Sequence, residues 1–293
     1  MCLGHLSGNI MKKPPCLSAK LLACSFFFIS NASLAEDIAT PNVAVTGSIT
    51  LVNDYIWRGQ SQTWGNPALQ VGLEVNHISG IYGGVWTSNV SNQWVPGGHI
   101  ETDFYTGYRN ALPDSWSEFH YDLNLLYAYY PEANFDQARF TPRLKSTQPN
   151  GLEASVAVNY KWLSLKTGRV LTSFYGWNTN NSPVGAFAGD PTAGVTGSTR
   201  GSWFIEANAN YEFSPGWSLN GQVGRETIRN SHNLDWNYYK TGVTRSMGTW
   251  AANLSYSASS ELAAINNFIG LNNNGDSYDA MKPRILVSVS RGF

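Results

Sequence analysis

The sequence predicts an all-β fold, a single transmembrane, antiparallel, up-and-down β-barrel of about 12 strands, with 10 or 14 strands as alternatives. Three observations predict it: blocks in which apolar and polar residues alternate, connections that are alternately short and long, and a C-terminus that ends on an alternating strand. Alternation with a period of two is typical of a strand with one apolar face. Blocks of about ten residues fit a tilted strand that crosses a bilayer.

Twelve such blocks follow one another along the chain. The clear ones span residues 42–58, 68–77, 100–109, 119–130, 152–160, 202–213 and 284–293, and the weaker ones span 81–90, 163–175, 217–226, 236–245 and 249–257. We expect apolar side chains such as Val71, Leu123 and Ile205 to face away from the barrel centre. Any one block could equally be a strand of a soluble sandwich or barrel, so the prediction depends on features that the blocks share.

Aromatic residues cap several of the apolar faces. They form the pairs Tyr55 with Trp57, Tyr127 with Tyr129, Trp203 with Tyr211, and Trp250 with Tyr256. Aromatic side chains at strand ends are typical of the two interfacial girdles of a membrane barrel. We therefore expect these pairs at the membrane surfaces.

The connections alternate in length. Short links fall at residues 79–80, 161–162, 214–216 and 246–248, 110–117 is intermediate, and long polar loops span 60–67, 91–98, 131–150, 176–200, 227–235 and 258–283. A barrel inserted into the outer membrane from the periplasm has short periplasmic turns and long extracellular loops. An even number of strands then places both termini on the periplasmic side.

The last strand should close the barrel against the first, because an unpaired backbone group in hydrocarbon is costly. The lipid-facing residues expected on it are Ile285, Val287, Val289 and Phe293, the inward ones are Ser288 and Ser290, and Arg291 is expected to reach the headgroups. The terminal Phe293 also resembles the signal read by the bacterial outer-membrane assembly machinery, which makes that machinery an expected partner beside membrane lipid.

Residues 1–35 have the pattern of a cleaved secretory signal peptide, which leaves 36–293 as the outer-membrane barrel. Lys12 and Lys13 precede an apolar run over 21–29, and small residues at Ser33 and Ala35 precede Glu36. The run is too short to span a bilayer. A lipoprotein-like site ending at Cys24 is the alternative, and translation could start at Met11 instead of Met1.

The amino-acid composition argues against several classes of function. Charged residues are 13% of the chain, about half the usual share of a soluble protein. The leader holds three basic and no acidic residues, which leaves 16 basic against 20 acidic residues in the mature chain. This mild acidity argues against a nucleic-acid partner. All three cysteines lie in the leader, so no disulfide is expected in the mature chain.

The opening stretch Thr46–Gln62, with its Asp-Tyr-x-x-Arg-Gly-x-Ser run, resembles the TorF family of porins of Gram-negative bacteria, a Gcw-type family long known only as conserved exported proteins of proteobacteria. Similar features follow at residues 66–70, 80–90, 101–108 and 126–131. The resemblance runs from about residue 44 to the C-terminus and is weakest in the long loops. It implies an outer-membrane barrel with pore activity and no particular substrate.

The inward face carries ionisable residues, which a membrane barrel tolerates only near water or partners. The candidate pore-lining residues are Asp54, Arg58, Glu74, Glu101, Asp103, Arg109, Asp122, Glu153, Lys166, Glu206, Glu226 and Lys240, with Lys161 as a further basic residue. Asp54 and Arg58 are four residues apart on one face of the first block. This spacing fits two interpretations, a charge pair in the lumen or an ion pair at the level of the aromatic girdle. Whether the lumen is open stays undecided, because barrels of eight strands are filled and those of 16 hold channels.

Chemistry at a catalytic or metal site has little support in the sequence. The four histidines of the mature chain, His77, His99, His120 and His232, lack metal-ligand spacing. His77 lies near Ser79, but the following glycine favours a tight turn over a catalytic pair. Residues 272–277 have oxygen-bearing side chains without the terminal glutamate of a calcium loop. We expect no catalytic residue, metal or cofactor.

The sequence therefore predicts a channel in the outer membrane for the passive passage of small hydrophilic solutes or ions, mildly cation-preferring because inward carboxylates outnumber inward basic residues. The alternatives are a non-conducting barrel with a structural, adhesive or assembly role, an outer-membrane enzyme, and a soluble periplasmic β-protein. Oligomeric state is not predicted.

Overall fold

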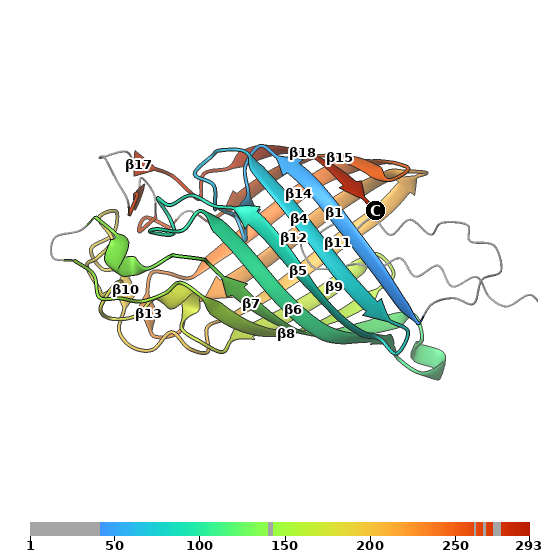
Figure 1. Cartoon of the computed structure of the whole chain (residues 1–293), viewed down its shortest axis with the longest axis horizontal. Coiled ribbons are helices and arrows are strands. Elements are labelled where there is room, and N and C mark those ends of the chain that lie inside the picture. The colour runs from blue at the N-terminus through green and yellow to red at the C-terminus, as the bar shows by residue number, and fades with distance from the viewer. Residues whose placement is uncertain (1–41, 140–142, 261, 266–267, 272–276) are drawn as a thin grey trace, which may run out of the picture.

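The computed structural model describes residues 42–139, 143–260, 262–265, 268–271 and 277–293. The predicted leader lies outside these residues. Twelve strands form one closed antiparallel barrel (Figure 1). They are β1 (Val43–Val52), β4 (Ala68–His77), β5 (Ile81–Asn89), β6 (Ile100–Ala111), β7 (Phe119–Tyr129), β8 (Gly151–Tyr160), β9 (Leu163–Val170), β11 (Trp203–Ser214), β12 (Trp217–Thr227), β14 (Trp236–Met247), β15 (Trp250–Ser259) and β18 (Arg284–Gly292). The predicted all-β barrel of 12 strands is confirmed.

Smaller elements lie in the connections. Three small two-stranded sheets pair β2 (Ile56–Trp57) with β3 (Gln60–Ser61), β10 (Gly194–Val195) with β13 (Ser231–His232), and β16 (Phe268–Ile269) with β17 (Ser277–Tyr278). Three 3₁₀ turns are η1 (Asp114–Trp116), η2 (Phe135–Gln137) and η3 (Phe174–Gly176). Among the residues described, no helix has the length and apolar character needed to cross a membrane.

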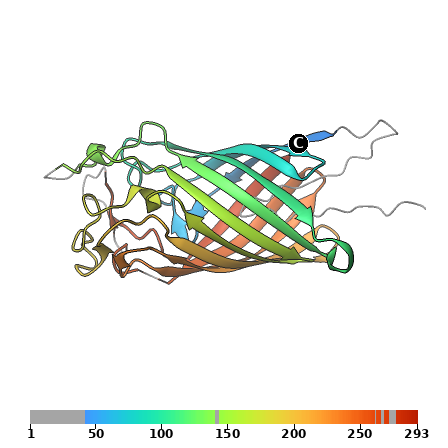
Figure 2. The same ribbon diagram turned by 90° about the horizontal axis from the view of Figure 1, so that it is seen from below.

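The strands run up and down in chain order around the barrel, and β1 pairs with both β4 and β18. Figures 1 and 2 show the long loops gathered at one end and the short turns at the other. We call these the loop end and the turn end. The C-terminus lies at the turn end, where β1 also begins (Figure 1), so the predicted alternation of short and long connections matches the structure.

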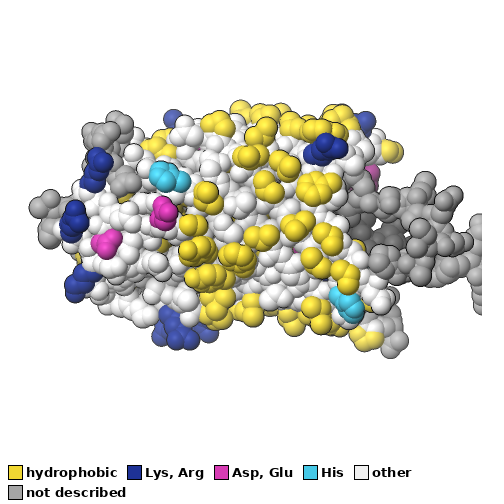
Figure 3. All heavy atoms as spheres, viewed as in Figure 1, with side chains coloured by type: hydrophobic (Ala, Val, Ile, Leu, Met, Phe, Trp, Pro, Cys, Tyr) yellow, Lys and Arg dark blue, Asp and Glu magenta, His cyan; other side chains and the backbone are white. Residues whose placement is uncertain are grey.

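Burial alternates along the strands, as a barrel with a polar interior requires. Leu123 and Ile205 are exposed on the outer wall, whereas residues of the opposite parity, such as Glu206, are buried. Figure 3 shows hydrophobic side chains spread over the barrel wall, with most charged side chains gathered at the loop end. This apolar outer wall is that of a barrel embedded in a membrane.

The C-terminal strand closes the barrel as predicted. Residues from Ser48 to Val52 of β1 pair with β18, and Gly47 exchanges two backbone hydrogen bonds with Phe293, at 2.9 and 3.0 Å. The Phe293 ring lies on Gly47, where a Cβ atom would overlap it. Ile285, Val287 and Val289 of β18 are exposed on the outer wall, whereas Leu286 is buried. The Arg291 guanidinium lies over the Trp250 ring, 5.5 Å from its centroid.

Two predicted strands end early. The first ends at Val52 instead of residue 58, because the Asp54 carboxylate accepts hydrogen bonds from the hydroxyls of Ser61 and Thr63 and closes a compact loop. The second, β9, ends at Val170 instead of 175, because the chain turns through η3 with Tyr175 at a φ of 50°. In both places the chain leaves the wall at the loop end.

The buried hydrophobic core lies largely in the long loops. We call it the cap; its loop residues include Tyr55, Val95, Phe135, Trp177, Val195, Leu234, Ile265 and Met281, which come from all six long connections. Wall residues such as Trp86, Trp236 and Tyr238 extend it into the barrel. An exposed polar loop would not bury these side chains, so the loops form a packed structure at the loop end.

The predicted membrane girdle is wrong for one aromatic pair. Tyr55 is buried and meets the Trp86 ring edge-on, 5.3 Å between centroids, and Trp57 packs against Trp236 at 6.4 Å. Both residues follow the end of β1, so the alternation that would place them outside no longer applies. The other three pairs are exposed on the outer wall, as the girdle prediction requires.

Candidate functional site

Ten of the predicted pore-lining residues lie at inward positions of the strands. They are Glu74, Glu101, Asp103, Arg109, Asp122, Glu153, Lys166, Glu206, Glu226 and Lys240. Asp54 and Arg58 belong to loop 1, which we define as residues 53–67, between β1 and β4. The inner wall and loop 1 together therefore hold all twelve.

Arg58 occupies the barrel interior. Its Nη1 lies 2.7 Å from Glu226 Oε2 on β12, and its Nη2 lies 3.0 Å from Glu153 Oε2 on β8. The Trp236 indole Nε1–H donates to the Arg58 carbonyl oxygen at 2.8 Å. Strands β8 and β12 stand across the barrel from β1, where loop 1 begins. Loop 1 therefore crosses the interior and is fastened to the far wall.

The sequence Arg58-Gly59 allows this path. Arg58 has a φ of 44° and Gly59 a φ of 81°, both in the left-handed region. A Cβ atom at Gly59 would lie 2.8 Å from the Ser259 Cβ and 3.1 Å from the Tyr238 Cβ, so only glycine fits against this wall. The conformation of Arg58 costs about 1–3 kcal/mol. The two ion pairs and the indole hydrogen bond hold it there.

Burial makes the Arg58 contacts strong. The side chain is 8% exposed and that of Glu226 is 0% exposed. Burial alone would lower the pKa of Arg58, but the carboxylates of Glu153 and Glu226 outweigh it and raise the pKa. The guanidinium also lies over the Phe204 ring, 3.6 Å from its centroid. Arg58 is therefore a fixed positive charge inside the barrel.

The predicted pairing of Asp54 with Arg58 is wrong. Asp54 Oδ2 lies 3.1 Å from Arg284 Nε, while Arg58 faces the opposite wall. Burial raises the pKa of the Asp54 carboxyl, opposed by the hydroxyls of Ser61 and Thr63 and by Arg284. The four-residue spacing places two side chains together only on a continuing strand, and β1 ends at Val52.

A second cluster is built entirely from adjacent wall strands. Arg109 Nη2 on β6 lies 3.1 Å from Glu74 Oε2 on β4, and Arg109 Nε lies 3.9 Å from Asp122 Oδ2 on β7. The guanidinium lies over the Tyr82 ring, 3.6 Å from its centroid. The Tyr82 hydroxyl donates to Asp122 Oδ1 at 2.6 Å and accepts from Asn124. This cluster fixes polar side chains along one side of the wall.

A third group lies beneath the cap. Glu101 and Asp103 are both 5% exposed, and the hydroxyls of Tyr55 and Tyr130 hydrogen-bond to Glu101. Burial raises the pKa of Tyr55, Tyr130 and nearby Tyr175, so these phenols stay protonated donors. Within the described part of the chain, Glu101 Oε2 and Asp103 Oδ1 have no hydrogen-bond partner. The underside of the cap is therefore rich in carboxylate oxygen.

The three remaining lysines lie in different places. Lys166 on β9 points inward, with its Nζ 5.3 Å from the Phe204 ring centroid, and Lys240 on β14 is inward and half-buried. Lys161, which we also expected on the inner face, lies instead in the turn after β8, where its exposed Nζ is 3.6 Å from Glu118. The strand ends at Tyr160, so the alternation does not extend to it.

Sequence reasoning missed several residues of this interior. The missed residues are Arg284, Tyr82, Phe204, Trp236 and Tyr238. Strand parity could have found them, because Arg284 shares the face of Ser288 and Ser290, and Phe204 shares that of Glu206. The prediction of interior residues considered only charged residues, so it left out the aromatic rings over which the arginine guanidinium groups lie.

Among the residues that the structure describes, the other candidates form no site. His77 Nδ1 and Ser79 Oγ are 2.7 Å apart, but both residues are exposed, His77 as the last residue of β4 and Ser79 in the turn that follows. The Ser79 backbone N–H also donates to His77 Nδ1. This is a turn contact, as expected. Residues 272–276 of the calcium-loop candidate lie outside the described residues. Among those described, no three His, Cys, Asp or Glu residues cluster as metal ligands.

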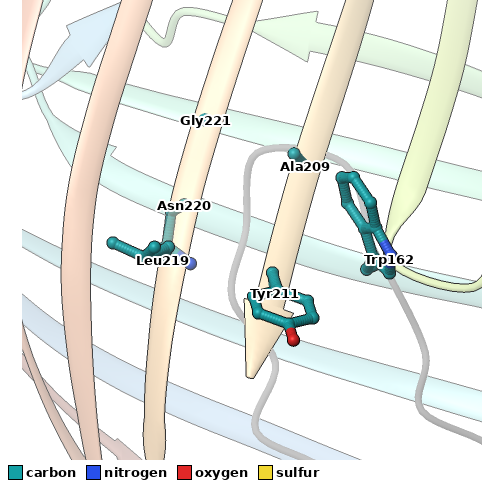
Figure 4. Close-up of a pocket in the computed structure, with 6 residues that line it drawn as sticks. All are labelled: Trp162, Ala209, Tyr211, Leu219, Asn220 and Gly221. Atoms are coloured by element: carbon teal, nitrogen blue, oxygen red, sulfur yellow. The ribbon is translucent and has the colours of Figure 1, made fainter. Parts of the chain in front are cut away.

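A hollow of about 460 Å³ lies on the outer wall near the turn end (Figure 4). Ala209 and Gly221 are paired in register there, and their small size leaves space between Trp162, Tyr211 and Leu219. The lining is apolar and faces away from the interior. It belongs to the membrane-facing surface and adds no polar group to the inner wall.

Comparisons with solved structures return porins and an outer membrane channel. A KdgM porin in complex with disordered oligogalacturonate is 7% identical, with 85% of this chain and 98% of that chain covered and a TM-score of 0.47. A NanC porin is 9% identical, with 85% and 99% covered and a TM-score of 0.46. An outer membrane channel from Pseudomonas putida F1 is 10% identical, with 87% and 97% covered and a TM-score of 0.44.

No curated protein matches the sequence. A protein family does match, over residues 36–293, which is the whole of the given sequence after the predicted leader. This chain belongs to the family described as bacterial protein of unknown function (Gcw_chp).

Proposed function

We propose that this protein is an outer-membrane channel for the passive passage of small hydrophilic solutes or ions, with a mild preference for cations. The observation that carries the proposal is the polar, ionisable inner wall of a barrel whose outer wall is apolar. Such a wall is tolerable in a membrane where the ionisable groups face water or pair with one another. The interior and loop 1 hold eight named carboxylates, against five basic residues when Arg284 is included.

The location is part of the proposal. A closed barrel with an apolar outer wall, a predicted signal peptide over 1–35 and short turns at the end that holds the C-terminus support insertion from the periplasm. The loop end would then face the cell exterior. The resemblance to TorF family porins supports the same assignment. We further propose that Phe293, exposed on the closing seam, is the contact for the barrel-assembly machinery.

The cation preference rests on how the charges are paired. Arg58 is shared by Glu153 and Glu226, and Arg109 by Glu74 and Asp122, so each arginine faces two carboxylates. Glu101 and Asp103 add oxygen atoms without a hydrogen-bond partner among the described residues. Charged rings set the selectivity of pores. The excess of carboxylate therefore favours cations at the narrow, loop-crossed part of the interior.

The test is single-channel recording of the purified, refolded chain in a planar bilayer, with a salt gradient to obtain the reversal potential. We expect discrete conductance steps and a reversal potential of the sign for cation selectivity. A clear anion preference would remove the cation proposal, and a silent bilayer with correctly folded barrel would remove the channel proposal. Resistance of the unheated protein to SDS, with a gel shift on heating, is the control for folding.

A non-conducting barrel is the second candidate, and the cap favours it. The buried aromatic core closes over the loop end, and loop 1 crosses the interior beneath it. If this arrangement is permanent, the protein has a structural or adhesive role. Absence of conductance both in the wild type and after release of loop 1 would establish that alternative. We assign no catalytic residue and no cofactor.

A further inference from the structure

Four arginines gather on the outer wall at the loop end, outside the interior used by the proposed channel. Arg169 at the end of β9 pairs in register with Trp203 on β11, and Arg225 on β12 pairs with Ile205. These two arginines therefore flank β11 on its outward face. Arg200 and Arg229 belong to the loops on either side of β11 and β12, and both are exposed.

The backbone at Gly201 brings two of the guanidinium groups together. Arg169 Nε donates to the Gly201 carbonyl at 3.4 Å, and Arg229 Nη1 donates to the Arg200 carbonyl at 3.1 Å. A Cβ atom at Gly201, which has a φ of 92°, would lie 3.2 Å from Arg229 Nη1 and 3.6 Å from Arg169 Nε. Two positive groups thus converge over one glycine, and each keeps further N–H donors to offer.

Charge balance at this cluster is incomplete. Among the described residues, the one ion pair of the four arginines is that of Arg225 Nη2 with Asp235 Oδ2, at 3.2 Å. Like charges at short range repel, so an anion that contacted several guanidinium groups would stabilise the arrangement. Planar guanidinium groups match the oxygens of a phosphate, to which they donate paired hydrogen bonds.

The surroundings of the arginines favour a lipid as the carrier of such an anion. In the strand register, Trp203 is level with Arg169 and Ile205 is level with Arg225, and both side chains are 40% exposed. One outward position nearer the barrel middle, Leu165 and Val223 are exposed on the outer wall, so the basic residues directly adjoin an apolar surface. A soluble phosphate would use only the basic part of this surface. An amphiphile with phosphate groups above acyl chains uses both parts.

We propose that Arg169, Arg200, Arg225 and Arg229 form a binding site for the phosphate groups of a phosphorylated membrane lipid in the outer leaflet. The site rests on the proposed outer-membrane location with the loop end outward, but it is independent of conductance. The apolar row below it takes the acyl chains, and the converging pair at Gly201 takes one phosphate.

The test uses the full mature chain, refolded in detergent, with bisphosphorylated lipid A added as the probe and with its dephosphorylated form as the comparison. Native mass spectrometry counts the lipid retained. We expect the phosphorylated lipid to be retained preferentially, and the double variant R169Q/R229Q to weaken its binding by roughly 30-fold, as expected for two basic side chains near an anionic headgroup. Inorganic phosphate should not compete at matched concentration.

The matched control is R245Q/R291Q, which removes two outer-wall arginines at the turn end, each lying over a tryptophan ring. It should leave retention unchanged. R225Q leaves both contacts at Gly201 intact, so it should weaken lipid retention less than the double variant does. It replaces the double variant in the test if that variant fails to refold. Equal retention of both lipids, equal loss in the control, or full competition by inorganic phosphate would each overturn the proposal. Because binding is measured in detergent, these results do not depend on where the protein resides or whether it conducts.

Discussion

The two arginine clusters of the interior have the same chemistry and different construction. Arg109 is held between Glu74 and Asp122 and lies over Tyr82, all on strands β4 to β7. Arg58 is likewise held by two carboxylates and lies over a ring, but it comes from loop 1 and reaches strands on the opposite wall. The Arg109 cluster stiffens a wall that is already hydrogen-bonded. The Arg58 cluster positions loop 1, whose strands β2 and β3 do not belong to the barrel sheet.

The largest expected effect follows from removing that attachment. Arg58→Ala leaves Glu153 and Glu226 as uncompensated buried charges, which costs about 3–5 kcal/mol. Loop 1 should leave the interior, and the single-channel conductance should rise several-fold. Arg109→Ala is the matched control: the wall strands stay paired, so its conductance should change little. Equal changes in the two variants would show that the clusters do not differ in role.

A backbone substitution tests the same attachment without removing a charge. Gly59→Val places a branched side chain at a positive φ and against Ser259 and Tyr238, so loop 1 cannot keep its path. The strain is at least about 1–3 kcal/mol. We expect faster proteolytic cleavage within residues 53–67 and a raised conductance. Gly221→Ala is the control, because a Cβ there meets only Ala209 at 3.9 Å. Unchanged cleavage in Gly59→Val would mean that loop 1 is not held by this turn.

The Arg109 cluster was predictable from the sequence, whereas the contacts of Arg58 were not. Glu74, Arg109 and Asp122 were predicted on the inner wall from alternation alone, because a strand in a closed barrel has only two faces. Arg58 was predicted inside for the wrong reason, as a strand residue paired with Asp54. Its position depends on a left-handed turn and on partners 95 and 168 residues away, and no local periodicity encodes such contacts.

The packing of the cap was likewise not predictable from local sequence patterns. Its residues are scattered over all six long loops, and each loop alone has a polar, irregular sequence. Tyr55 and Trp57 fit a membrane girdle when β1 is extended through them, and they fit the cap once β1 ends at Val52. The outer wall was predictable because lipid imposes one rule on every strand. The packing of the loops depends on specific tertiary contacts.

Removing one hydrogen bond from each arginine cluster tests the same difference with a smaller expected effect. Tyr82→Phe removes the hydroxyl that bridges Asp122 and Asn124, and Trp236→Phe removes the N–H that binds the Arg58 carbonyl. Each change should lower stability by about 1 kcal/mol, measured from the temperature of the SDS gel shift. Only Trp236→Phe should also increase current noise or conductance, since it acts on loop 1. A conductance effect confined to Tyr82→Phe would reverse the roles assigned to the two clusters.

The smallest expected effect concerns pH and Asp54 at the base of loop 1. Burial raises the pKa of its carboxyl, against the opposing hydroxyls of Ser61 and Thr63 and the Arg284 guanidinium. The folded loop therefore binds more protons than the unfolded chain once the pH exceeds the ordinary value of about 3.9. The stabilising contribution of protonation is complete below that value and is lost as the pH rises through the folded pKa. Asp54→Asn cannot ionise, so protection of loop 1 from protease should decline with rising pH in the wild type and stay level in the variant. Protection that instead grows with pH in the wild type alone would mean that the Arg284 pair, and not burial, governs this carboxyl.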